Sequence, residues 1–361
     1  MPTEQEMLEQ LREGKVQFPP LSIDFLKDQL DVGGNRRIDA LIEAKWQGKS
    51  AKFAVECKSL STPKTFQDCI NFLKSLSLPY NCRPMLFMPF LSEWQLEALE
   101  GEGISGIDLC GNCVVVYPGI FSVFRVGGKN RFPSSAAIKN VYRKNSSMVG
   151  RCFFIYSDFQ TVQDIRATIN KQNPLVKRWN KKPISLSTVS KVLKTMVEDL
   201  IITRNETIRL LQPGKLLEKL CENYNAPAVK KKIRIKMPEE NEGILKLLSE
   251  QSQKLGLPLM ASGTSSVTRY TVMQRGDLLT VYCPKVEKLL EKLPGIQSDR
   301  FPNLELLETD EESVYFDARQ AEGFWYASPL QVYMELMAGD KRDQETAEQL
   351  KTKILSDIGA A

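Results

Sequence analysis

The stretch Arg36–Ser59, RRIDALIEAKWQGKSAKFAVECKS, decides the fold of the N-terminal part of the chain. Apolar and polar residues alternate over residues 38–46 and again over 53–58, with the period of two that is typical of strands. The segment 47–50, Gln-Gly-Lys-Ser, has the composition of a turn. The sequence therefore predicts a β-hairpin.

A turn centred on Gly48 and Lys49 sets the register of this hairpin. It places Asp39 opposite Lys58 and Leu41 opposite Glu56. All four side chains then share one face, because side chains alternate along a strand. Asp39 lies diagonal to Glu56 in this register, within reach of a shared cation.

Two carboxylates and a lysine at one sheet edge suit metal-dependent hydrolysis of a phosphodiester. Carboxylates a few ångströms apart repel each other unless a cation binds between them. Mg²⁺ prefers one or two carboxylates together with water and substrate phosphate. A lysine can orient the attacking water or stabilise the charge that develops on phosphorus.

Asp39 followed by Glu56-Cys57-Lys58 at the end of the next strand resembles the signature of the PD-(D/E)XK restriction-endonuclease-like superfamily. Its members mostly cut DNA with Mg²⁺. The resemblance implies a mixed sheet flanked by helices over residues 1–128. It also implies that Asp39 and Glu56 are metal ligands for Mg²⁺ (or Mn²⁺) and that Lys58 is the catalytic lysine. A further acidic ligand often comes from the first helix, where Glu6 and Glu9 are the candidates.

Other interpretations of these residues compete with a nuclease site. Glu43-Ala44-Lys45 has the same spacing, but it lacks an upstream aspartate at a comparable cross-strand position. Asp39 and Lys58 could also form a cross-strand ion pair on a solvated face, which contributes little stability. The superfamily's proline is replaced by Ile38. Asp108 and Asn112 could lie near the site, but a role in a turn is favoured.

Composition limits the class of protein. A chain of 361 residues suggests two or three domains, and 42% hydrophobic with 26% charged residues is typical of a soluble globular protein. No apolar run approaches the roughly 18 residues of a membrane helix, and the acidic start is no signal peptide, so we expect a cytoplasmic location. Eight scattered cysteines suggest buried thiols, and the lack of histidine excludes Ser-His-Asp and Cys-His catalysis.

The middle of the chain changes character. Residues 129–147 are rich in Ser, Asn, Lys and Arg and predict a linker. We expect helices over 148–156 and 161–169, and a third from Ser187 with an apolar stripe at helical spacing. Residues 201–204 and 207–211 alternate as a small hairpin would. Residues 148–225 thereby resemble a winged helix-turn-helix.

Charge concentrates in this region. The whole chain has a net charge of +5, but residues 139–236 hold 21 Lys and Arg against 7 Asp and Glu, a net +14. Such a concentration is typical of a protein that binds a polyanion. A winged helix that docks protein is the alternative. The predicted contacts with double-stranded DNA are Ser187, Thr188, Lys191, Lys194, Arg204, Arg209, Lys177, Arg178, Lys181 and Lys182.

A lysine-rich stretch, 226–232, marks the next boundary, and residues 233–361 predict an α+β domain. Its end, over Ser328–Leu336 and Asp340–Leu350, resembles AbiEi-type antitoxins and transcriptional regulators, which carry a nucleotidyltransferase-like domain. Nucleotide transfer would need paired carboxylates after a Gly-Ser turn, and Gly263–Ser266 lacks them. We therefore expect a non-catalytic C-terminal domain.

Together these features predict a mixed α/β protein with three parts: a restriction-endonuclease-like sheet, a winged helix and an α+β domain. The leading hypothesis is a DNA-binding, Mg²⁺-dependent deoxyribonuclease. The alternative is a non-catalytic DNA-binding regulator or antitoxin of AbiEi type. The sequence leaves open an RNA substrate, a homodimer and a protein partner for the C-terminal domain.

Overall fold

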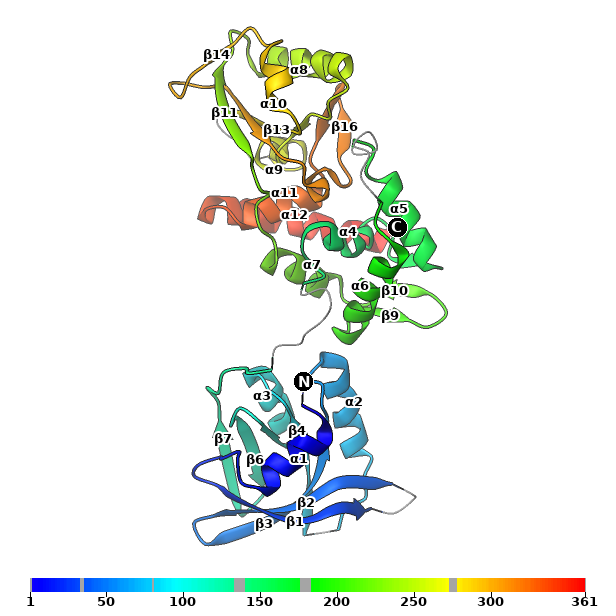
Figure 1. The fold of residues 1–361 in the computed structure, drawn as a ribbon, viewed down its shortest axis with the longest axis vertical. Coiled ribbons are helices and arrows are strands. Elements are labelled where there is room, and N and C mark those ends of the chain that lie inside the picture. Colours follow the sequence, from blue (N-terminus) through cyan, green and yellow to red (C-terminus); the bar gives the residue numbers. More distant parts are fainter. Residues whose placement is uncertain are drawn as a thin grey trace. The chain divides into compact units, whose positions relative to one another are not determined.

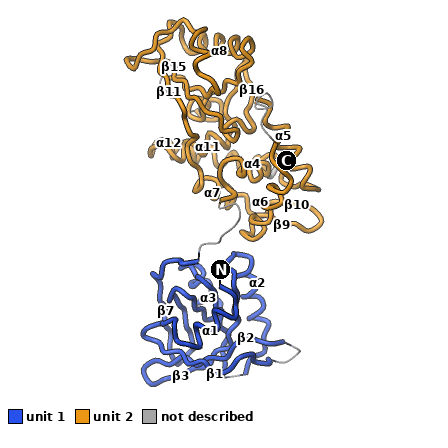
Figure 2. The backbone as a smooth tube through the Cα atoms, in the orientation of Figure 1, with its two compact units in different colours: residues 1–139 blue, residues 140–361 orange. Residues whose placement is uncertain are grey.

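The computed structural model of the protein describes residues 2–32, 36–79, 81–132, 140–175, 183–272 and 278–360. Within these ranges the fold is mixed α/β, with twelve α-helices and two large mixed sheets. The chain divides into two compact units, residues 1–139 and 140–361 (Figure 2). The boundary between them falls inside the predicted linker 129–147. None of the helices in the described ranges has the length and apolar character that a membrane span requires.

Unit 1 is built on a seven-stranded sheet in which the strands follow one another in chain order (Figure 1). The strands are β1 (Ser22–Asp31), β2 (Arg37–Trp46), β3 (Lys49–Cys57), β4 (Cys82–Met88), β5 (Ser105–Asp108), β6 (Cys113–Tyr117) and β7 (Phe121–Arg125). The pairs β3–β4 and β4–β5 are parallel, and the other pairs are antiparallel. The sheet is therefore mixed, and the predicted hairpin forms β2 and β3.

Helices cover both faces of this sheet. Helix α1 (Glu4–Arg12) buries Met7 and Leu11 in the same core cluster as Phe53. Helices α2 (Pro63–Lys74) and α3 (Glu93–Gly101) bury their apolar residues in a second cluster with Ala54. Neighbouring residues of β3 thus enter different cores, because successive side chains of a strand point to opposite faces.

The turn between β2 and β3 is shorter than predicted. Trp46 pairs with Lys49, so the loop is only Gln47-Gly48, and both residues are left-handed with φ of 50° and 75°. Two left-handed central residues are typical of a type I′ turn, whose twist matches the flanking strands. The register moves by two residues as a result. Lys58 is therefore not opposite Asp39, and Leu41 pairs with Ala54 instead of Glu56.

Unit 2 begins with three helices and a small sheet. These are α4 (Lys144–Cys152), β8 (Asp158–Phe159), α5 (Val162–Lys171), α6 (Leu186–Glu198), β9 (Ile202–Arg204), β10 (Ile208–Leu210) and α7 (Pro213–Glu222). Helix α4 starts four residues before its predicted start at Met148, inside the predicted linker. The antiparallel sheet has the order β8-β10-β9, so a two-residue strand joins the predicted hairpin.

The rest of unit 2 carries the second large sheet, in the order β14-β11-β15-β13-β12-β17-β16. Its strands are β11 (Lys231–Lys236), β12 (Met260–Ala261), β13 (Leu279–Cys283), β14 (Ile296–Gln297), β15 (Leu304–Glu308), β16 (Arg319–Ala321) and β17 (Phe324–Tyr326). Its helices are α8 (Asn241–Leu255), α9 (Gly263–Ser266), α10 (Val286–Leu290), α11 (Pro329–Met337) and α12 (Lys341–Ala360), with the 3-10 turns η1 (Val267–Arg269) and η2 (Glu312–Tyr315).

Two features of this region bear on how its parts connect. The lysine-rich stretch 226–232 leads into the sheet, because β11 begins at Lys231 and pairs with β14 and β15. Helices α11 and α12 are separate at the end of the chain. Helix α4 contacts η2, and α7 contacts α11, so the three-helix part and the second large sheet share one compact unit.

Candidate functional site

Asp39 and Glu56 lie at the end of the β2–β3 pairing in unit 1. The last paired residues are Ala40 and Val55, and Asp39 and Glu56 are the next residue on each strand. Directly opposed Cβ atoms are about 5 Å apart, whereas diagonal neighbours are about 7–8 Å apart. The short turn therefore makes Glu56, instead of Lys58, the residue of β3 that is level with Asp39. Oδ2 of Asp39 accepts a hydrogen bond of 2.7 Å from the backbone N–H of Cys57, which holds the aspartate at the end of β3.

Lys58 follows β3 and reaches back to the glutamate. Its Nζ donates a hydrogen bond of 2.6 Å to Oε1 of Glu56. Its backbone N–H donates to the carbonyl of Phe87 at 2.9 Å, which extends the parallel pairing of β3 with β4 past Cys57. The Lys58 side chain is 32% exposed and that of Glu56 only 9%, so the lysine faces solvent at the rim of a buried carboxylate.

Burial and the neighbouring charged groups shift the pKa values of Glu56 and Lys58. Desolvation raises the pKa of Glu56; the hydrogen bond from Lys58 opposes this rise, and the charge of Asp39 adds to it. Desolvation by itself would lower the pKa of Lys58, but its hydrogen bond to Glu56 and the nearby acidic charges give a net rise. The net result is a raised pKa for both Glu56 and Lys58.

Glu4, at the start of α1, is an acidic residue near this site that the sequence analysis missed. Its backbone carbonyl accepts a hydrogen bond of 3.7 Å from Sγ of Cys57, and its charge contributes to the raised pKa of Glu56. The expected Glu6 instead accepts from the backbone N–H of Thr3 at 2.7 Å and caps the helix, while Glu9 is exposed. The capping pattern Thr-x-x-Glu was the available signal, because it commits Glu6 to the helix terminus.

The donor set suits a hard cation at the two strands. Oδ1 of Asp39 and Oε2 of Glu56 accept no hydrogen bond from any described residue. Two carboxylate oxygens are enough for Mg²⁺ or Mn²⁺ when water and a substrate phosphate complete the shell. In the described ranges no group of three or more Asp, Glu or Cys side chains has the geometry of a metal site. Protein ligands are thus limited to this pair, with Glu4 near it.

The competing triplet Glu43-Ala44-Lys45 lies near the turn, with Ala44 buried and the two charged side chains partly exposed. Nζ of Lys45 contacts Oδ2 of Asp24 at 2.7 Å and Oε2 of Glu43 at 3.3 Å, and its side chain is 47% exposed. These exposed ion pairs contribute little stability.

Asp108 organises a turn at the end of β5. Its carboxylate accepts hydrogen bonds from the backbone N–H groups of Leu91, Cys110 and Asn112 at 2.8–2.9 Å and from Nδ2 of Asn112 at 2.7 Å. Desolvation raises the pKa of Asp108 although these four hydrogen bonds favour the charged form. All acceptor positions are used locally, which agrees with the favoured role in a turn.

Helix α6 carries the predicted DNA contacts of unit 2. Ser185 caps its N-terminus by accepting from the N–H of Thr188 at 3.1 Å. Val189, Val192, Leu193 and Met196 are buried, as the predicted stripe requires. Ser187, Lys191 and Lys194 are exposed, and Thr188 is half-buried. The helix thus buries one face and presents hydroxyl and ammonium groups on the other.

Two further predicted contacts lie on the small sheet. Arg204 and Arg209 are exposed residues of β9 and β10, and Arg209 pairs with Thr203 across the hairpin. Lys177, Arg178, Lys181 and Lys182 fall outside the described residues.

The lysines at the start of β11 contribute less free charge than the sequence suggested. Lys230 forms an ion pair with Asp310, Lys231 with Glu287 and Lys232 with Glu305, at distances of 2.8–3.1 Å. Arg234 also pairs with Glu305 and Lys219 with Glu222, so five of the 21 cations in the basic segment have an acidic partner among the described residues.

The Gly263 turn of the C-terminal region is occupied by an internal carboxylate. Oε2 of Glu335 accepts from the N–H of Gly263 at 2.8 Å, and its Oε1 accepts from Nε2 of Gln331 at 2.9 Å and from the hydroxyl of Tyr282 at 3.2 Å. Burial raises the pKa of Glu335, and these hydrogen bonds oppose the rise. The backbone donors that would meet a phosphate in a nucleotide-binding turn are bound to this glutamate instead.

Comparison with known proteins gives no relative. No protein-family model matches the chain, and neither the curated proteins nor the solved structures yield a match. The family resemblances inferred from the sequence therefore stay predictions.

Proposed function

We propose that the protein is a DNA-binding, metal-dependent deoxyribonuclease of the PD-(D/E)XK type. The observation that carries this proposal is the position of Asp39 and Glu56 one residue beyond the last β2–β3 pair, with Lys58 hydrogen-bonded to Glu56 at the end of β3. The raised pKa of Glu56 supports it, because a divalent cation would relieve a buried carboxylate that faces acidic neighbours.

Each residue would have a separate role in hydrolysis. Asp39 and Glu56 would hold Mg²⁺ or Mn²⁺, which when bound supplies Lewis-acid stabilisation of the phosphodiester. Lys58 would release Glu56 to the cation and use its ammonium group to orient the attacking water or to stabilise negative charge on the phosphate. The exposed third of its side chain makes this change of partner possible.

The first part of unit 2 would bring the catalytic unit to duplex DNA. Its order of helix, strand, two helices and two strands resembles a winged helix-turn-helix. In that motif the third helix enters the major groove, and here α6 would present Ser187, Thr188, Lys191 and Lys194. The hairpin with Arg204 and Arg209 would contact phosphates as the wing.

The test is digestion of plasmid and linear DNA with Mg²⁺ or Mn²⁺ by the wild type, Glu56→Ala and Lys58→Ala. Lys45→Ala is the matched control, since it removes an ammonium from the same hairpin away from the site. We expect cleavage by the wild type and Lys45→Ala only, with DNA affinity preserved in all four proteins. Cleavage that survives in Lys58→Ala would refute this assignment.

A non-catalytic DNA-binding regulator of AbiEi type is the second candidate. Two observations favour it: no described group of three acidic or cysteine ligands surrounds the candidate site, and Glu335 occupies the Gly263 turn. This function predicts a sequence-specific, salt-dependent complex with DNA and no nicking with any divalent metal. Homodimerisation and a protein partner for the C-terminal part are compatible with both functions.

A further inference from the structure

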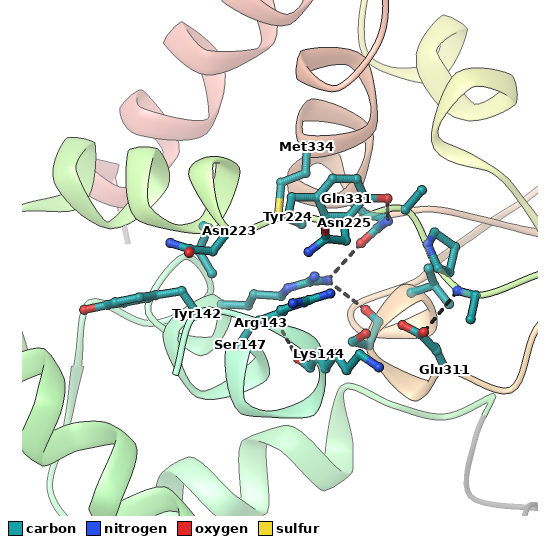
Figure 3. Close-up of a pocket in the computed structure, with 17 residues that line it drawn as sticks. Tyr142, Arg143, Lys144, Ser147, Asn223, Tyr224, Asn225, Glu311, Gln331 and Met334 are labelled. Atoms are coloured by element: carbon teal, nitrogen blue, oxygen red, sulfur yellow. Dashed lines mark hydrogen bonds between the residues drawn. The ribbon is translucent and has the colours of Figure 1, made fainter. Parts of the chain in front are cut away.

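A small cavity lies inside unit 2, and none of the predicted catalytic or DNA-binding residues is among those that line it. It has a volume of about 140 Å³, and its walls come from the start of α4, the end of α7 with residues 223–228, η2 and α11 (Figure 3). Sites for drug-sized ligands measure roughly 300–1,000 Å³. The cavity therefore suits a small ion or one functional group of a larger molecule.

Cations dominate the walls of this cavity. Arg143 and Lys144, at the start of α4, line it together with Arg151 from the same helix. Among the described residues, no carboxylate lies within ion-pair distance of any of the three. Glu311 is the acidic group in the wall, and its Oε1 already accepts from the N–H of Ala228 at 3.0 Å.

Arg151 is the unusual member of this group. Its side chain is 4% exposed, its Nη1 donates to the carbonyl of Ser313 at 2.7 Å and to Oε1 of Gln331 at 2.9 Å, and no described residue accepts from its Nε. Desolvation lowers the pKa of Arg151 to about 10, so the guanidinium is still charged at neutral pH. A buried guanidinium that meets only neutral acceptors, and that has one unpaired N–H, favours an anion nearby.

The internal acidic groups do not supply that acceptor. Glu335 is the nearest candidate, but Gln331 lies between it and the arginine, accepting from Arg151 and donating to Glu335. Arg143 uses Nε and Nη2 to donate to the amide oxygen of Asn225 at 2.8 and 3.1 Å, in the amide orientation that satisfies both groups. Both arginines are thus positioned by neutral acceptors, and neither forms an ion pair with a described carboxylate, although the charge of Glu335 acts on Arg151 from beyond ion-pair distance.

We propose that this cavity binds a phosphate group, held by Arg143, Lys144 and Arg151. A tetrahedral dianion has enough oxygens to accept from several cations at once, and guanidinium groups are the preferred partners of phosphate. The ligand is inorganic phosphate or the phosphomonoester of a small molecule. This inference goes beyond the proposed nuclease function and does not depend on it.

The site bridges two parts of unit 2. Arg151 and Ser147 belong to the helical part, whereas Gln331 and Ser313 belong to the part that carries the second large sheet. The hydroxyl of Tyr142, another wall residue, donates to the carboxylate of Asp199, which caps the C-terminus of α6. Bound phosphate would therefore stabilise the junction next to the predicted DNA-reading helix.

Calorimetric titration of the full chain with sodium phosphate in metal-free buffer at constant ionic strength tests this proposal. We expect one saturable site in the wild type and at least about tenfold weaker binding in Arg143→Ala/Lys144→Ala, since one lost charge-assisted contact is worth about tenfold in affinity. Both residues are exposed, so the variant keeps its core. Lys246→Ala/Lys254→Ala, with the same loss of charge on α8, should bind like the wild type.

Additional variants and ligands in the same titration distinguish phosphate binding from a purely structural role of these residues. Arg151→Lys keeps the positive charge but loses the planar guanidinium group with its several N–H donors. This variant should bind phosphate more weakly even if its melting temperature is unchanged. AMP that binds as tightly as phosphate would identify a phosphomonoester as the ligand, and weaker binding would identify the free ion. The proposal is overturned if the wild type binds no phosphate, if acetate binds equally well, or if both double variants lose the same affinity.

Discussion

Replacing Glu56 with glutamine should stabilise the metal-free protein while it abolishes cleavage. Two unit charges about 5 Å apart, in surroundings with an effective dielectric constant of about 20, repel by about 3 kcal/mol. Glu56→Gln removes this repulsion from Asp39; the separation is that expected for facing residues one step beyond the Ala40–Val55 pair. It also removes a partly exposed, charged hydrogen bond to Lys58, which costs about 2 kcal/mol. The net effect is a gain of about 1 kcal/mol, or roughly 3 °C in melting temperature.

The sign can be checked through pH. The pKa of Glu56 is raised in the folded state, so its ionisation destabilises the fold as pH rises through that value. The advantage of the glutamine variant should therefore be full at pH 7 and should shrink as pH falls and Glu56 becomes protonated. Saturating Mg²⁺ should raise the melting temperature of the wild type and leave that of the variant unchanged.

Scanning fluorimetry of the full chain at pH 7 and pH 4, with and without Mg²⁺, provides the measurement. Glu43→Gln is the matched control, because Glu43 lies on the same hairpin and contacts Lys45 at 3.3 Å away from the site. Its melting temperature should stay within about 1 °C of the wild type, as is usual for surface ion pairs. A clear loss of stability in Glu56→Gln at pH 7 would show that Glu56 is a structural ion-pair partner.

Three further outcomes are expected. Lys191→Ala and Lys194→Ala should each reduce the salt dependence of duplex binding by about one counterion without changing the melting temperature; an unchanged slope of log K against log salt would remove α6 from the interface. Asp108→Ala should cost about 3 kcal/mol in urea denaturation, because four donors around one buried carboxylate lose their acceptor, and a cost below about 1 kcal/mol would contradict that role. Gly48→Ala should cost about 1 kcal/mol, since φ at this position is 75°, and a neutral result would mean that the turn can adopt another geometry.

The sequence predicted the elements whose signals are local. Period-two alternation located β2 and β3, and the apolar stripe of α6 identified Val189, Val192, Leu193 and Met196 as its buried face. The sequence also predicted that Asp39, Glu56 and Lys58 lie together. A shift of the hairpin register by two residues keeps all three side chains on the same face of the sheet. Local periodicity is enough here, since each pattern reflects which side of one element is buried.

The relative positions of Asp39, Glu56 and Lys58 depended on the tertiary structure. Only the backbone shows that Gln47 and Gly48 form the whole loop, which shifts the register by two residues and makes Glu56, instead of Lys58, level with Asp39. Glu4 enters for a similar reason: α1 packs against the sheet through Met7 and Leu11, and this packing decides which acidic residue of the helix approaches β3.

No pattern in the sequence predicted the cavity that we propose to bind phosphate. Arg151 meets Ser313 and Gln331, which are 162 and 180 residues away along the chain. The same holds for the lysines of β11, which look like a free basic run but pair with acidic residues of distant segments. Composition and periodicity thus determined which segments form helices and strands and where positive charge gathers. Register and long-range packing determined which charged side chains meet, because such contacts depend on how separate elements bury their apolar faces together.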